Sequence, residues 1–95
     1  MDKKLLKTSL NTIWALVLLA NQKKDLNFNQ LKELRAALNT IRDNWSEDDG
    51  NYGRATRMCE WIDTSGILSV PPRKPQGTEG IMQDCQLLQR YLDSN

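Results

Sequence analysis

The side chains that most often carry out catalysis are sparse in this sequence. It contains no histidine, the most common general base of enzymes, and no serine or cysteine has a base that its place in the sequence identifies. Acidic residues are plentiful, but we expect none of them to be paired inside an apolar helical stripe, where burial would raise its pKa. The sequence therefore predicts a protein that is not an enzyme.

Patterns typical of metal sites are equally weak. Cys59 and Cys85 lie far apart without any histidine, which does not fit a zinc site. The acidic segment 43–50 suggests calcium, but counting from Gly50 finds neither the first acidic ligand nor the final glutamate of an EF-hand. We predict no metal and no cofactor. Both cysteines fall at apolar positions of helical patterns and are expected to be buried thiols, although a disulfide between them stays open.

The most informative candidate for a binding site is a tryptophan close to two arginines. In the helix expected here, one stripe faces inward, formed by Tyr52, Ala55, Cys59 and Ile62. At about 100° per residue, Trp61 then faces outward together with Arg54 and Arg57. Arg57 is one turn before Trp61, so the two side chains can stack. Since both residue types are enriched at binding hot spots, we predict that Arg54, Arg57 and Trp61 form a partner-binding surface.

A set of basic residues that could bind phosphate is the second candidate. The set comprises Lys23, Lys24, Lys32, Arg35 and Arg42. A helix-turn-helix arrangement is disfavoured, because the loop after residue 45 is too long and the acidic residues 47–49 would face phosphates. Binding of a nucleic acid or nucleotide, with Trp61 stacking on a base, is therefore the alternative prediction.

Four segments with helical periodicity must position these residues. They span about 3–21, 28–45, 51–64 and 78–92. Asn27 and Gln30 have the spacing of a capping box, Gly66 is placed to end the third helix, and Thr78 is placed to cap the fourth. No segment has the sustained alternation of a strand. We predict an all-α fold, a compact single-domain bundle of about four helices over residues 1–95.

The connection 67–77 is expected to be extended, because its three prolines exclude helix. It contains a P-x-x-P pattern with two basic residues, which can dock on an aromatic groove but is also common in plain connections. If it folds back, Pro71 and Pro72 could cover Trp61. That arrangement is the alternative to a partner-binding role for Trp61.

The first helix is apolar on all sides from Ile13 to Ala20. Such a segment is either central in the bundle or covered by another chain, so a homodimer through this helix is a further prediction. The apolar run is too short to span a bilayer. It also lacks a small residue at position 18, where a signal-peptide cleavage site would need one. We therefore expect a cytoplasmic protein without membrane contact.

The overall charge of +1 predicts no bulk attraction to nucleic acid or to anionic membranes. A short, helical, single-domain chain without an enzyme signature is a profile shared by phage-encoded inhibitors of host defence, toxin-neutralising proteins and small adaptors. We therefore expect a non-enzymatic protein-binding module that acts as a small inhibitor or adaptor of another macromolecule.

Overall fold

The computed structural model describes residues 1–71 and 73–94, so Pro72 and Asn95 lie outside the described residues. The described residues form helices and connections without a strand. The helices are α1 (Lys3–Asn21), α2 (Phe28–Asn44), α3 (Tyr52–Thr64) and α4 (Thr78–Asp93). The predicted all-α fold is confirmed, and each predicted boundary agrees to within one residue.

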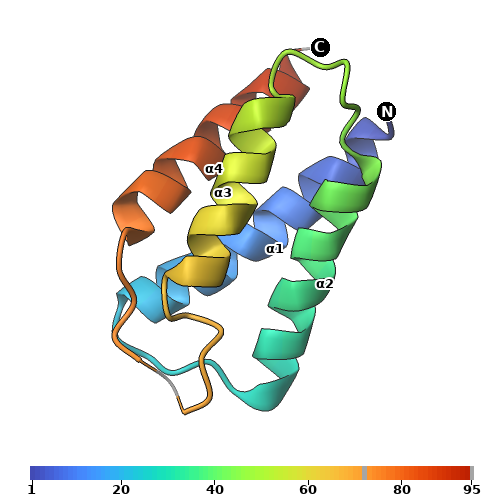
Figure 1. The fold of residues 1–95 in the computed structure, drawn as a ribbon. Coiled ribbons are helices and arrows are strands. Elements are labelled where there is room, and N and C mark those ends of the chain that lie inside the picture. Colours follow the sequence, from blue (N-terminus) through green and yellow to red (C-terminus); the bar gives the residue numbers. More distant parts are fainter. Residues whose placement is uncertain (72, 95) are drawn as a thin grey trace.

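The four helices form an antiparallel bundle in which each helix packs beside the next (Figure 1). α1 lies between α2 and α4, and α3 closes the other side by packing on α2 and α4. The connection 45–51 lies at the same end as the start of α1 (Figure 1). The connections 22–27 and 65–77 lie together at the opposite end, where α3 ends and α4 begins.

The apolar second half of α1 is covered within a single chain. Ile13, Leu16 and Val17 are buried in the core, and Leu19 packs against it from a half-buried position. A homodimer is therefore not needed to cover Leu16 and stays a prediction, which light scattering tests directly for this 10.9 kDa chain.

Among the described residues, no helix combines the length and the apolar character needed to cross a membrane.

The helix ends show which local signals in the sequence were reliable. The capping box is confirmed, because Asn27 Oδ1 accepts from the Gln30 amide at 2.8 Å and Gln30 Oε1 accepts from the Asn27 amide at 2.9 Å. Gly66 follows α3 with a φ of +96°, as expected for a helix terminator. The prediction that Thr78 caps α4 is wrong: Gly77 holds that position, and the buried Thr78 hydroxyl donates to Asn21 Oδ1 at 2.6 Å.

Both cysteines are buried, as predicted, and both thiols are free. Burial raises the pKa of Cys59 to about 11 and that of Cys85 to about 12. The Cys85 thiol also donates to the Leu10 carbonyl at 3.3 Å. Because a thiolate is the reactive form, neither side chain is suited to act as a nucleophile near neutral pH.

Asp49 holds the acidic loop between α2 and α3 in place. Its carboxylate accepts hydrogen bonds from Trp45 Nε1 at 3.0 Å, from the Asn51 amide at 2.9 Å and from the Tyr91 hydroxyl at 2.5 Å. Desolvation by burial would raise the pKa of Asp49, but the three hydrogen bonds and the positive charge of Lys3 together lower it. The loop is thereby tied both to the end of α2 and to α4.

The lowered pKa of Asp49 predicts a specific dependence of stability on pH. The stabilisation is complete above the ordinary pKa of about 4 and is lost as the pH falls through the lower folded value. Asp49→Asn should cost about 1–2 kcal/mol of unfolding free energy at pH 7 and flatten the loss of stability in acid. Urea denaturation at a series of pH values from 7 down into acid measures the unfolding free energy at pH 7 and its dependence on pH. The control is Asp48→Asn, which removes an exposed carboxylate of the same loop. If the unfolding free energy depended on pH equally in the two variants, the prediction would be contradicted.

Candidate functional site

Trp61 lies on α3 and packs against the first turn of α4. A Cβ atom added to Gly80 would lie 3.2 Å from Trp61 Cζ3, so the absence of a side chain at Gly80 makes room for the ring. Trp61 nevertheless stays 41% exposed. Gly80 thus packs against one part of the ring. Of the two prolines expected to cover the ring, Pro71 is exposed and does not line the hollow beside Trp61, and Pro72 lies outside the described residues.

Arg57 stacks on Trp61, as its position one turn earlier predicted. The guanidinium carbon lies 5.0 Å from the centroid of the ring, within the range of a cation–π interaction. The same guanidinium donates to Asp84 on α4, with Nη2 3.2 Å from Oδ1 and Nε 3.3 Å from Oδ2. Arg57 therefore holds the exposed ring and links it to the neighbouring helix.

Arg54 joins the same carboxylate, with its Nη1 3.2 Å from Asp84 Oδ1. An external partner is therefore not needed to explain two arginines on this face, because both arginines pair with Asp84 within the chain. Asp84 is only 4% exposed and carries one negative charge against their two positive charges. The cluster formed by Arg54, Arg57, Trp61 and Asp84 keeps a positive excess at the surface.

Asp84 is a buried carboxylate that was not among the predicted site residues. Asp84 is three residues after Ile81 and four before Leu88, and both of these apolar side chains are buried. That spacing places Asp84 on the edge of the inward face of α4. A carboxylate at such a position signals a cation on the neighbouring helix, since charged side chains are rarely buried without a partner.

A hollow of about 410 Å³ lies beside Trp61. Its other lining residues come from the end of α3, from the connection and from the start of α4: Thr64, Ser65, Gln76, Gly77 and Gly80. The connection is held against α3 by a hydrogen bond from the Gln76 amide to the Ser65 carbonyl at 2.9 Å. An exposed aromatic ring beside such a hollow can receive a side chain of another molecule.

Two members of the predicted basic set, Arg35 and Arg42, are engaged within the chain itself. Arg42 pairs with Asp63 on α3, and Arg35 donates to the Leu68 carbonyl at 3.2 Å. Lys32 is exposed on α2. Asp63 is two residues from Trp61, about 200° around a helix, so Arg42 and Trp61 lie on different sides of α3. Arg42 is therefore not placed beside the aromatic ring.

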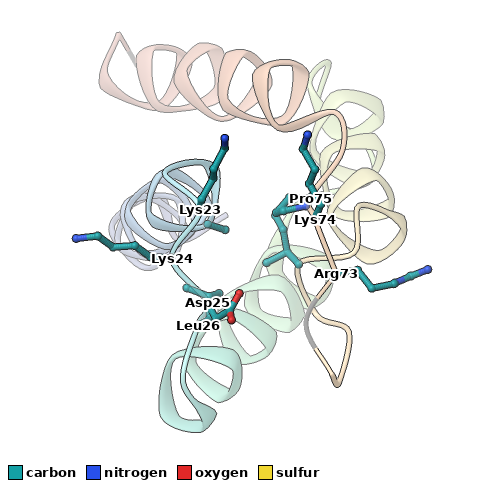
Figure 2. Close-up of a pocket in the computed structure, with 9 residues that line it drawn as sticks. Lys23, Lys24, Asp25, Leu26, Arg73, Lys74 and Pro75 are labelled. Atoms are coloured by element: carbon teal, nitrogen blue, oxygen red, sulfur yellow. The ribbon is translucent and has the colours of Figure 1, made fainter.

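Lys23 and Lys24 instead line a pocket of about 260 Å³ at the end of the bundle, opposite Arg73 and Lys74 of the proline-containing connection. Lys23 and Lys74 extend in the same direction from its two sides, whereas Lys24 and Arg73 point away from it (Figure 2). Asp25 is the carboxylate among the lining residues. This meeting of two distant segments was not predicted.

Metal-binding geometry is not found in the described part of the chain. No group of three or more cysteine, histidine, aspartate or glutamate side chains there is close enough to hold a metal ion. The acidic loop that suggested calcium uses Asp49 for hydrogen bonds to Trp45 and Tyr91. The groups around Trp61 are suited to non-covalent binding, through the aromatic ring and the two arginine side chains.

The packing of Gly80 on Trp61 predicts an unusual result for glycine replacement. Alanine in a helix is favoured over glycine by about 1 kcal/mol, so Gly53→Ala on α3, with open space around it, should stabilise the fold by up to that amount. Gly80→Ala should gain less, because its new methyl group presses on Trp61. Thermal denaturation measures the difference, and the Trp61 indole N–H signal in NMR spectra should shift. Equal stabilisation with an unmoved signal would contradict the prediction.

Comparisons of this chain with protein-family models, with curated proteins and with solved structures give no match.

Proposed function

We propose that this chain is a non-enzymatic protein-binding module, a small cytoplasmic inhibitor or adaptor, and that its contact surface is centred on Trp61 with Arg54 and Arg57. One observation carries the proposal: the Trp61 ring is held in place by Arg57 and Gly80 and is still 41% exposed beside a hollow. A surface of this kind matches the aromatic and arginine anchors that dominate binding energy at protein interfaces.

The fixed position of the ring favours binding because little side-chain freedom remains to be lost when a partner docks. Phe28 and Val70 are more exposed, at 74% and 78%. Trp61 is the better anchor because a cation and a glycine orient it and because it borders a hollow. Arg54 and Arg57 have a structural role on Asp84, and their outer surface remains available to a partner, since both side chains stay partly exposed.

The alternative, a nucleic-acid or nucleotide binder, has weaker support. Arg57 already lies over the Trp61 ring, so less aromatic surface is left for a base to stack on. Two of the cations proposed for phosphate, Arg35 and Arg42, bind groups of the chain itself. This alternative predicts retention on heparin that disappears at moderate salt, whereas an apolar protein contact changes little.

Site-specific photo-cross-linking tests the proposed surface. A photoreactive residue at Thr64, which is exposed and lines the hollow, should give one dominant protein adduct in cells of the native host. The same residue at Glu47, in the loop at the opposite end of the bundle, is the control and should not give that adduct. Loss of the adduct in a Trp61→Ala background would support the proposal. An adduct that forms equally from both positions, or that does not depend on Trp61, would contradict it.

A further inference from the structure

The hollow beside Trp61 is one part of a longer surface at the end of the bundle. A second hollow, of about 300 Å³, shares Thr64, Ser65 and Gln76 with the Trp61 hollow. It also shares Arg73 and Lys74 with the pocket that contains Lys23. Neighbouring hollows therefore border the same residues, and we call the three together the end surface, which runs from Trp61 past Gln76 and Lys74 to Lys23.

The connection 65–77 builds this surface by folding back on itself. Gly66 has a φ of +96°, and a Cβ added there would lie 3.5 Å from the Lys74 carbonyl oxygen and 3.5 Å from Arg73 Cβ. The start and the end of the connection thus lie against each other, and the hydrogen bond from the Gln76 amide to the Ser65 carbonyl joins them. Two basic residues that are distant from Trp61 in the sequence are thereby placed on a surface continuous with it.

The charges of the end surface have one dominant sign. Lys23, Lys24, Arg73 and Lys74 line its basic part, where Asp25 is the acidic lining residue. Lys23 and Lys74 both line this pocket, and their side chains extend in the same direction from its two sides (Figure 2). The same pocket has apolar lining residues, among them Leu26, Ile67 and Pro75. The Arg54, Arg57 and Asp84 group adds a positive excess near the Trp61 part.

We infer that the end surface binds an acidic protein segment, with an apolar side chain in the Trp61 hollow and carboxylates between Lys23 and Lys74. The inference rests on the proposed function and specifies the chemistry of its partner. Charge complementarity supports it, because cations at the rim of an interface attract and orient an acidic partner. The overall charge of only +1 and the arginine stacked on Trp61 favour this partner over a nucleic acid.

Selection from a random peptide library displayed on phage tests the inference. The folded chain is the target, and the Trp61→Ala variant removes peptides that bind elsewhere. Recovered peptides should carry an apolar residue followed by aspartates or glutamates. The Lys23→Glu and Lys74→Glu double variant should bind them about tenfold more weakly. The matched control is Lys4→Glu with Arg90→Glu, two exposed residues near the other end that change the net charge equally, and it should bind normally. Circular dichroism verifies that both double variants are folded.

The outcomes separate the inference from the proposed function. Trp61-dependent peptides without acidic residues would overturn the inference and leave the proposed function standing. A selection that yields no Trp61-dependent peptide would overturn both. A short mixed-sequence DNA strand is tested in parallel, and DNA binding that the Lys23 and Lys74 double variant abolishes, without acidic peptides, would reassign the surface to nucleic acid. Equal weakening by both double variants would show that only net charge matters and would also overturn the inference.

Discussion

Replacement of Arg54 and Arg57 together by methionine should lower the free energy of unfolding by about 3 kcal/mol. Both guanidinium groups pair with the buried Asp84 carboxylate. The double variant leaves this carboxylate without a cation in a place that water reaches poorly, and that is where most of the cost arises. Methionine retains length and helix propensity, so the helix itself changes little. Urea denaturation at pH 7 measures the loss.

A third substitution shows whether the buried charge is the cause. Adding Asp84→Leu to the double variant removes the unpaired carboxylate and should recover most of the lost stability, because an apolar group tolerates this position. Each single arginine variant should lose less than half of the full amount, since the remaining arginine still pairs with Asp84. If the triple variant were as unstable as the double variant, the loss of stability would come from lost packing of the arginine side chains and not from the buried charge.

Trp61→Ala should weaken binding of the partner by about 2 kcal/mol, which is about 30-fold in the dissociation constant. The partner is the protein identified by cross-linking from Thr64, and titration calorimetry measures its affinity. The free energy of unfolding should fall by only about 1 kcal/mol, because the ring is 41% exposed and packs on Gly80 and Arg57 at the edge of the bundle. A large change in affinity with a small change in stability is the signature of an interface residue.

Trp14→Ala is the matched control for this experiment. Trp14 is half-buried on α1, so the substitution removes the same side chain from a different part of the bundle. It should lower the thermal midpoint without changing the affinity of the partner. A Trp61→Ala variant that is less stable but binds normally once folded would contradict the proposed surface.

The helices were predictable from the sequence because each carries an apolar stripe at helical spacing and its own end signals. Leu31, Leu34, Leu38 and Ile41 on α2 are all buried in the bundle. The capping box of Asn27 and Gln30 involves residues three apart, so it needs only local geometry to form. The stacking of Arg57 on Trp61 also needs only local geometry, because the two residues are one helical turn apart.

The misassigned residues all depend on contacts between segments that are distant in the sequence. Thr78 was expected to cap its own helix, but its hydroxyl reaches Asn21 at the end of α1. Asp84 was overlooked because its two arginines lie on another helix, and helical spacing within α4 does not show what faces it. Gly80 gave no signal either, since only the Trp61 ring explains why a side chain is disfavoured there.

The sequence by itself determined the helices, their ends and the outward direction of Trp61, because these follow from backbone geometry and from side chains three or four residues apart. Only the tertiary structure decided what surrounds that ring. The packing of α3 on α4 brings Asp84 to both arginines, and the folded connection brings Lys74 opposite Lys23. Such pairs depend on how helices are arranged in space, and periodicity along one helix contains no information about the neighbour that it meets.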